Sequence, residues 1–203
     1  VHTIEWQGFG AAKQAGLERA KGEWVLSIDA DEEVTPALRE EIRQAVNGNG
    51  NLAGYTIPRR TSFLGRWIRH CGWYPDPVLR LFRRSRGRFD DALVHERVVV
   101  DGPTARLSGE LLHYSYPSLE SYFEKFNRYT TLGAEEAFAR GERARWYHFI
   151  GKPLMCFIKH YVLKKGFLDG IEGMVISVLS SCSVFVKYAK LRDLQRRARE
   201  RTT

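Results

Sequence analysis

Residues 29–33, DADEE, place four carboxylates directly after the apolar run EWVLSI. Such a run is typical of a strand buried on both faces, and in open α/β sheets ligands bind beyond the carboxyl ends of the strands. Because side chains alternate along a strand, Asp29 and Asp31 are predicted to leave it on the same side. Two hard oxygen ligands that leave positions for water and phosphate suit Mg²⁺ or Mn²⁺. The pattern indicates a divalent cation that neutralises a diphosphate leaving group.

A second interpretation of this acidic run needs no metal. The helix dipole favours carboxylates near a helix N-terminus, and Glu32 and Glu33 precede a predicted helix. An Asp-X-Asp triplet also recurs by chance. Its position after a buried strand is what favours the metal site.

The elements around the acidic run predict an α/β fold. Residues 10–21 have alanines at near-helical spacing, and Gly22 suits the position after a helix. With the strand-like opening VHTIEW, they make a βαβ unit of a mostly parallel sheet. Thr35 is predicted to cap a second helix with Pro36 at its first position.

The sequence changes character after residue 51. Short apolar pieces separated by Gly, Pro and Asp predict a smaller, partly antiparallel region over residues 52–116. Residues 118–140 are predicted to form an amphipathic helix capped by Ser118. We therefore expect a domain at 1–140 and a helical appendage at 141–203, interrupted at LKKGFLDG.

Net charge is distributed unevenly along the chain. Residues 1–140 hold 19 basic and 19 acidic residues, whereas residues 141–203 hold 13 basic and 5 acidic, which accounts for the whole net charge of +8. A nucleic-acid-binding protein would more often carry basic residues across its globular part, so that class is not expected. The basic appendage instead predicts contact with an anionic membrane surface.

Length and composition bound the setting of the protein. With 203 residues, 43% of them hydrophobic, the chain can bury a core. Its three cysteines have no CxxC spacing and favour a reducing, cytoplasmic compartment. The opening VHTIEW has neither an initiator Met nor a signal-peptide core. It predicts that this sequence begins inside a domain.

Several ordered motifs together resemble glycosyltransferase family 2. The run AAKQAGLERAKGEWVLSIDADEEVTPAL is similar to that family, and GWYPDPVLRLFRR, DALVHERV and LLHYSY resemble its bacterial lipopolysaccharide core glucosyltransferases. The resemblance covers nearly the whole chain. It implies a GT-A fold lacking its first strands, which would be one or two βαβ units of at least ~30 residues each.

The resemblance also implies an activity. It implies transfer of a sugar, with glucose expected, from a UDP-sugar to a lipopolysaccharide core heptose, with a divalent cation and inversion at the anomeric carbon. In that family the Asp-X-Asp motif holds the ribose and the metal-bound diphosphate, which corresponds here to Asp29 and Asp31. The implied acceptor is a membrane-anchored glycolipid, and the implied location is peripheral, on the cytoplasmic face of the bacterial inner membrane.

An inverting transfer needs a base to remove the proton of the acceptor hydroxyl. Glu96, which follows His95 between two predicted strand ends, is the first candidate, and Asp91 and Asp76 are the alternatives. Glu96 could equally be an exposed strand residue paired with an arginine. His95 is more often a structural hydrogen-bonding residue than a catalyst.

His113 and several basic residues are the remaining site candidates. His113 follows an apolar run at a place where GT-A enzymes commonly put a histidine near the metal, although a histidine at a strand end is usually structural. The resemblance places Lys13 near the donor nucleotide. Arg80 and Arg83 could face the acceptor or the diphosphate, or form the polar face of a strand. Three further polar residues could close over the phosphates, but they are more simply the solvent-exposed side of a helix: Lys125, Asn127 and Arg128.

The apolar stretch 173–186 is shorter than the ~20 residues that span a bilayer and contains four serines. Flanked by lysines and arginines, it predicts an interfacial helix held by anionic lipid. The alternative is a helix packed on the catalytic domain.

Two other functions remain open. A catalytically silent GT-A-like module that docks at membranes would show the same tail, although intact Asp29, Asp31 and Glu96 argue against it. A transferase acting on a polyprenyl phosphate or another envelope glycan would share the whole site.

Overall fold

The computed structural model describes residues 3, 5, 8–48, 50–90 and 97–200. The chain divides into two compact units. The first unit comprises Val1–Arg60 and Pro75–His113, and the second comprises Thr61–Tyr74 and Tyr114–Thr203. Two strands, β3 (Gly54–Phe63) and β9 (Leu111–Tyr116), continue from one unit into the other.

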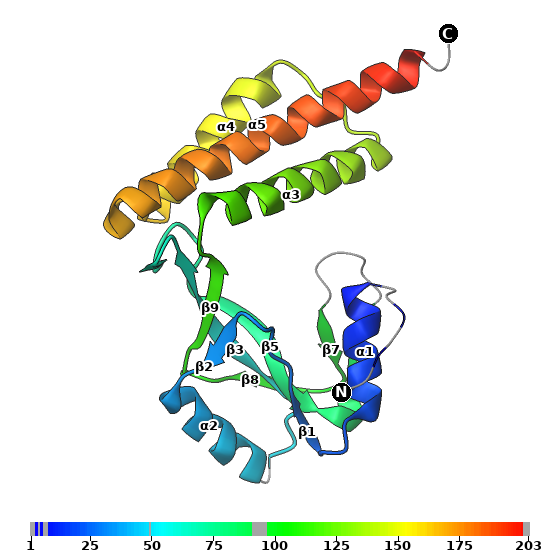
Figure 1. Ribbon diagram of the computed structural model, residues 1–203, viewed down its shortest axis with the longest axis vertical. Coiled ribbons are helices and arrows are strands. Elements are labelled where there is room, and N and C mark those ends of the chain that lie inside the picture. The colour runs from blue at the N-terminus through cyan, green and yellow to red at the C-terminus, as the bar shows by residue number, and fades with distance from the viewer. Residues whose placement is uncertain (1–2, 4, 6–7, 49, 91–96, 201–203) are drawn as a thin grey trace. The chain divides into compact units, whose positions relative to one another are not determined.

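The first unit is a mixed sheet with helices (Figure 1). Its helices are α1 (Phe9–Arg19), α2 (Pro36–Asn47) and the 3₁₀ turn η1 (Arg84–Arg86). Besides the parts of β3 and β9, its strands are β1 (Trp24–Leu26), β2 (Glu32–Val34), β5 (Asp76–Arg83), β6 (Gly87–Phe89), β7 (Val98–Val100) and β8 (Thr104–Arg106).

The main sheet has the strand order β1-β5-β3-β9-β2, and β6 pairs with β7 in a separate two-stranded sheet. The pairs β1–β5, β2–β9, β3–β5 and β6–β7 are antiparallel, whereas β3–β8 is parallel. The predicted α/β class is confirmed, and so is the antiparallel character of residues 52–116. The described pairings correct the expectation of a mostly parallel sheet. The short connections from β3 to β5 and from β6 to β7 allow antiparallel pairing without a crossover helix, and β1–β5 and β2–β9 are antiparallel pairs between strands distant in the chain.

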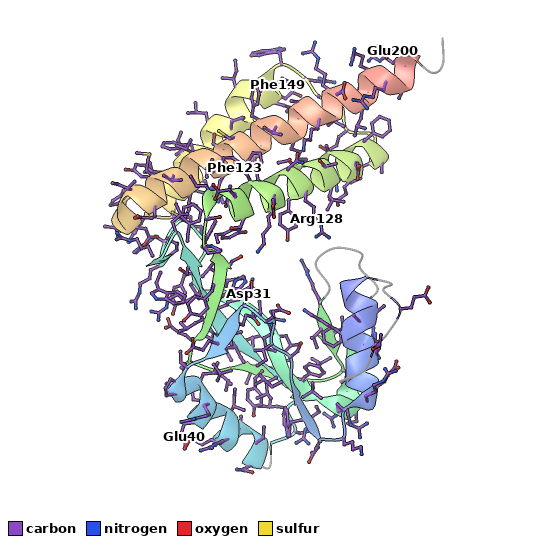
Figure 2. All side chains as sticks on the ribbon, viewed as in Figure 1. Asp31, Glu40, Phe123, Arg128, Phe149 and Glu200 are labelled. Atoms are coloured by element: carbon purple, nitrogen blue, oxygen red, sulfur yellow. The ribbon has the colours of Figure 1, made fainter. Side chains whose placement is uncertain are left out.

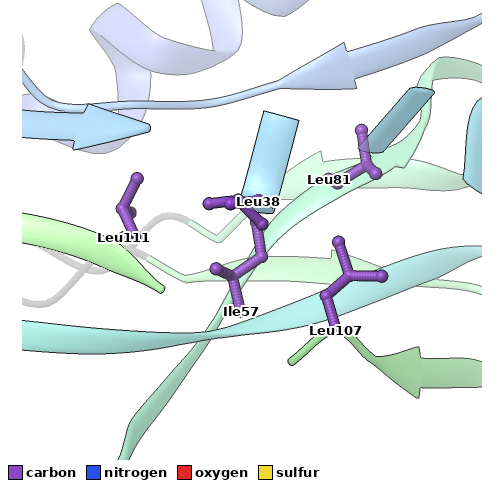
Figure 3. Close-up of a cluster of buried hydrophobic side chains, with 5 residues drawn as sticks. All are labelled: Leu38, Ile57, Leu81, Leu107 and Leu111. Carbon is purple, nitrogen blue, oxygen red and sulfur yellow. The ribbon is translucent and has the colours of Figure 1, made fainter. Parts of the chain in front are cut away.

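Two hydrophobic clusters lie on opposite faces of β5. Leu81 packs with Leu38 of α2 and with Ile57 of β3 (Figure 3). The next residue, Phe82, packs instead with Leu17 of α1 and Phe89 of β6. Adjacent strand residues point to opposite faces, so α1 and α2 cover the sheet from its two sides. The short strand at 24–26, predicted to be buried on both faces, is partly buried.

Helix α2 begins as its sequence predicts. The Thr35 Oγ1 accepts a hydrogen bond from the Leu38 backbone N–H at 3.3 Å, and Pro36 occupies the first turn. The same hydroxyl donates to the Glu110 carbonyl oxygen at 2.8 Å, which ties the helix start to the segment before β9. This cap fixes the direction in which the chain leaves the acidic run.

The second unit is mainly helical, as the predicted helical C-terminal segment requires (Figure 1). It contains the short strand β4 (Arg66–Trp67) and five helical elements: α3 (Leu119–Ala139), α4 (Tyr147–Phe157), the π-helix η2 (Ile158–Leu163), the 3₁₀ turn η3 (Gly166–Asp169) and α5 (Gly170–Glu200). Ser118 caps α3 in a capping box with Ser121.

Two clusters hold this helical unit together. One joins Ile68 and Cys71 to Tyr122 of α3 and Ile176 of α5. The other packs alanines of α3 against Tyr188 and Leu191 of α5. The predicted boundary at residue 140 lies in the loop after α3, inside this unit. The separate role predicted for residues 141–203 stays a prediction.

Replacing Thr35 with alanine should destabilise the protein. The change removes the acceptor for the Leu38 N–H and the donor to Glu110, and loss of a helix cap costs about 1 kcal/mol. We expect the free energy of unfolding, measured by urea denaturation, to fall by about 1–2 kcal/mol. Thr35→Ser keeps the hydroxyl and should stay close to wild type. Equal losses in both variants would contradict the capping role.

Candidate active site

The acidic run forms a hydrogen-bonded turn between β1 and β2. Strand β1 ends at Leu26, and the Glu32 N–H donates to the Asp29 carbonyl oxygen at 3.0 Å. The Asp29 N–H in turn donates to Oε2 of Glu32 at 2.9 Å. The sequence predicted that alternation along a strand sets the directions of the Asp29 and Asp31 side chains. That prediction is wrong, because both residues lie in this turn after the strand has ended.

Asp29 lies between two cations. Its Oδ1 is 2.7 Å from Nζ of Lys13 on α1, and its Oδ2 is 2.5 Å from Nη2 of Arg80 on β5. Burial raises the pKa of the Asp29 carboxyl, but Lys13 and Arg80 together outweigh burial and hold the pKa below its usual value. Asp29 is therefore ionised at neutral pH, and the structure brings together three of the predicted donor-site residues.

Glu32 is the buried centre of a charge network. Its side chain is fully buried, and Oε1 lies 2.6 Å from Nη2 of Arg80 and 3.3 Å from Nη1 of Arg59. Arg59 also donates to Oδ2 of Asp76 from Nε and Nη2, at 3.0 and 2.6 Å. A buried carboxylate requires charge partners, and these guanidinium groups supply them from β5 and β3.

Arg80 reaches this network because β5 is irregular there. Tyr55 pairs with Leu81 and Thr56 pairs with Leu79, so Arg80 is an extra residue opposite β3. Its carbonyl oxygen accepts a hydrogen bond from the Ser27 N–H at 2.8 Å, which holds the β1 side in place. Such bulges redirect a side chain, and here the guanidinium points to the turn. The buried Nε of Arg80 has no hydrogen-bond partner among the described residues.

Asp31 and His113 form the second pair of the site. Asp31, labelled in Figure 2, immediately precedes β2. Its Oδ2 lies 3.3 Å from Nε2 of His113 on β9. The Asp31 side chain is 43% exposed and could contact a ligand, whereas the neighbouring His113 side chain is only 14% exposed.

The chemistry of these donors fits a substrate-assisted metal site. The described residues contain no group of three or more acidic, histidine or cysteine side chains arranged to hold a metal. A carboxylate with a neighbouring imidazole can hold a divalent cation when substrate phosphates and water supply the other ligands. Both carboxylate oxygens of Asp29 already contact the side chains of Lys13 and Arg80, so Asp31 and His113 are better placed to bind a metal ion.

The other predicted residues lie elsewhere. Arg83 does not join the cluster: it pairs with Glu23, donates to the Leu52 carbonyl oxygen and lies over the Trp24 ring. Asp76 is paired with Arg59. The three candidates His95, Glu96 and Asp91 lie outside the described residues, so their assignment stays a prediction.

Helix α3 carries polar residues that are engaged within the second unit. Nζ of Lys125 donates to the carbonyl and hydroxyl oxygens of Ser115, and Oδ1 of Asn127 accepts from Lys190 at 2.7 Å. Both residues therefore have structural partners in the fold, where the simpler sequence interpretation expected only the solvated side of a helix.

Sequence reasoning missed Glu32 as a central residue and Arg59 altogether. Glu32 was assigned to the acidic start of a helix, because burial of one carboxylate among four cannot be read from the run DADEE. A signal for Arg59 exists in GYTIPRRTSF, where two arginines sit in an otherwise strand-like segment. A charge in such a segment requires a partner.

Comparison with known proteins identifies the family. The sequence model described as Glycosyl transferase family 2 matches residues 1–108. The lipopolysaccharide core biosynthesis glycosyltransferase LpsC of Rhizobium meliloti is 30% identical over 198 residues, covering 91% of this chain and 72% of LpsC. The chain belongs to glycosyltransferase family 2. An uncharacterized glycosyltransferase of Rickettsia prowazekii is 26% identical over 200 residues, covering 93% of this chain and 68% of that protein.

The family match confirms the resemblance drawn from the motifs and makes the protein a glycosyltransferase. The matched region contains the Asp29–Glu32 turn, Lys13, Arg59 and Arg80. The charge network is thus part of the family 2 glycosyltransferase domain.

Glu32→Gln should destabilise this glycosyltransferase. Glutamine keeps the size of the side chain but leaves Arg80 and Arg59 without their buried countercharge, and breaking a buried pair costs about 3 kcal/mol. We expect a loss of about that size in the free energy of unfolding, measured by urea denaturation. The neighbouring exposed Glu33 offers a matched control, and Glu33→Gln should change stability by less than about 0.5 kcal/mol. If both variants unfold like wild type, the network is not a structural constraint.

Proposed function

We propose that this glycosyltransferase moves a hexose, expected to be glucose, from a UDP-sugar to the heptose of a lipopolysaccharide core glycolipid, with inversion at the anomeric carbon. The observation that carries the proposal is the Asp29–Glu32 turn, with Asp31 beside His113 and with Asp29 held by Lys13 and Arg80. The name of the Rhizobium relative supports the choice of a lipopolysaccharide core acceptor.

In this proposal the donor binds against the turn. Asp29 is held ionised and fixed in place by its two cations, so its carboxylate can accept hydrogen bonds from ribose hydroxyls. The Lys13 side chain is 22% exposed, so its ammonium group can also interact with a diphosphate. Arg80, almost fully buried, positions Asp29 and contributes a fixed positive charge beneath it.

Asp31 and His113 would hold a Mg²⁺ or Mn²⁺ ion. When bound, such an ion supplies Lewis-acid stabilisation to the negative charge that develops on the leaving diphosphate. Asp31 contributes the hard oxygen ligand. His113 borders the same position and limits how far the Asp31 carboxylate can move.

The acceptor hydroxyl requires a base on the face opposite the leaving group. We assign this role to Glu96, with Asp91 as the alternative, because Asp76 is committed to Arg59 through two hydrogen bonds. The base removes the hydroxyl proton as the oxygen attacks the anomeric carbon.

We also propose a peripheral location at the cytoplasmic face of the inner membrane. The basic residues of the C-terminal segment suit an anionic lipid surface, and the proposed acceptor is itself anchored in lipid. By length and composition, Gly166–Glu200 could cross a membrane, but that test is also passed by helices that do not.

Asp31→Asn should abolish most of the transferase activity with little effect on folding. The change removes a metal-binding charge from a side chain that is 43% exposed, so turnover should fall by about two orders of magnitude or more while the melting temperature stays near wild type. His113→Ala should weaken binding of Mn²⁺ and UDP together, measured by calorimetry. The control is Glu33→Gln, which should transfer sugar normally. Full activity of Asp31→Asn, or of wild type in excess EDTA, would exclude this metal site.

Glu96→Gln should lower kcat and leave UDP binding unchanged. Glutamine keeps the shape of the side chain but cannot accept the proton, and loss of a general base typically costs about 10²–10⁴ in rate. The measurement is steady-state transfer from radiolabelled UDP-glucose to a soluble acceptor analogue, together with calorimetry of UDP binding. Asp91→Asn is the parallel variant. A near-normal kcat for Glu96→Gln with a collapsed kcat for Asp91→Asn would move the role to Asp91.

A further inference from the structure

Large apolar side chains are exposed where η2, η3 and the start of α5 meet. Ile171 is 78% exposed and Leu163 is 68% exposed, which is unusual for neighbouring aliphatic residues. We call this group the apolar ridge and define it as Leu163, Phe167, Leu168, Ile171, Met174 and Val178. Its parts belong together, because η2, η3 and α5 pack on one another.

The ridge is built on a tightly held turn rather than on a frayed end. The buried Asp169 carboxylate accepts hydrogen bonds from the His70 N–H at 2.7 Å and from the Arg69 N–H at 3.3 Å, and its Oδ1 lies 3.0 Å from the His70 ring. Gly166 and Gly173 approach so closely that a Cβ on Gly173 would overlap the Gly166 carbonyl. The fold therefore stabilises the exposure of the ridge.

The exposed face of α5 continues from apolar into basic. At intervals of three or four residues it carries the exposed Ile171, Met174, Val178, Cys182 and Phe185 and, after the partly buried Ala189, the exposed Arg192, Arg196 and Arg199. The side of α5 toward α3 is polar in part, since Nζ of Lys190 donates to Asn127, Thr130 and Thr131. The opposite face of α5 is also apolar, but Ile176, Tyr188 and Leu191 on it are buried in the clusters of this unit, which leaves the exposed stripe as the face available to an external surface.

Charge complementarity indicates what covers the ridge. Lys164 and Lys165 follow Leu163 directly and are exposed, and exposed arginines end the same face of α5. Lysine and arginine can place their stems beside apolar surface while their charged ends reach phosphate groups. An apolar surface bordered by such cations matches the boundary between acyl chains and anionic headgroups.

Geometry also favours a helix that lies flat. The exposed apolar stripe from Ile171 to Phe185 covers 14 steps of 1.5 Å, or ~21 Å, which is shorter than the ~30 Å hydrocarbon core of a bilayer. In addition, α4 packs along α5 (Figure 1), and its Phe149 lies against the cluster that contains Tyr188 and Leu191.

We propose that the apolar ridge inserts into the headgroup boundary of an anionic bilayer, with α5 lying in the plane of the membrane surface. The basic face of α5 supplies attraction to the headgroups, and the ridge supplies apolar burial that salt does not screen. This inference deepens the proposed function by naming the surface through which the enzyme reaches a lipid-anchored acceptor, and it rests on that function only for the acceptor.

The test compares two double variants that add the same charge. Leu163→Glu/Ile171→Glu alters the ridge, and Leu119→Glu/Phe138→Glu alters exposed apolar positions of α3 in the same unit. Flotation is measured on phosphatidylcholine vesicles with and without phosphatidylglycerol, at about 0.1 M and about 1 M salt. We expect wild type and the α3 variant to float with anionic vesicles, partly even at high salt. The ridge variant should lose the salt-resistant fraction by about tenfold or more.

Four results would overturn the proposal. The first is equal flotation of the ridge variant and wild type, and the second is an equal loss in the α3 variant. The third is wild-type protein that only detergent, and not an alkaline wash, releases from membranes, which would indicate a spanning helix. If wild type does not float but sediments as a dimer that the ridge variant dissociates, the ridge binds a second copy instead.

Circular dichroism and UDP calorimetry accompany each variant. Native spectra exclude unfolding as the cause of lost flotation. UDP binding should be the same in all three proteins, because none of the changed residues belongs to the donor site. Absence of UDP binding from wild type would refute the proposed donor without affecting the flotation result.

Discussion

The first unit of this glycosyltransferase depends on one buried carboxylate. Glu32 has no exposed side-chain surface, and its buried carboxylate requires the guanidinium groups of Arg80 and Arg59 as partners. Those arginines come from adjacent strands, so the contact joins the turn after β1 to β5 and β3 at once. A single buried carboxylate thereby fixes the turn that carries Asp29 and Asp31.

Sharing of Arg80 couples structure to chemistry. The same Nη2 atom contacts Oδ2 of Asp29 and Oε1 of Glu32, so one guanidinium neutralises a site carboxylate and a structural one. Arg59 repeats the arrangement with Glu32 and Asp76. A chain of alternating charges of this kind holds its members in a narrow range of positions, as a preorganised site requires.

The sequence predicts those features whose cause is local. The caps at Thr35 and Ser118 follow from a hydroxyl placed before a helical pattern, and both are confirmed. The resemblance predicts Lys13 near the donor nucleotide, but its contact with Asp29 was not predicted, since a lysine in a helix pattern alone suggests only solvent. The direction of the Arg80 side chain could not be predicted from the sequence, because it depends on a bulge that shifts the register of β5 by one residue. The burial of Glu32 likewise depends on strands that meet only in the folded chain.

The path of the chain between its two units limits how such enzymes can be recombined. The chain passes from one unit to the other after residues 60, 74 and 113, and two of these passages lie inside β3 and β9. Residues 61–74 bring Ile68 and Cys71 to the helical unit, where they pack with Ile176. A chimera that took its C-terminal helices from a relative through a single junction would therefore separate an inserted hairpin from the helices shaped to receive it. Exchange of the C-terminal helices of this chain for those of a relative requires two segments to be replaced together.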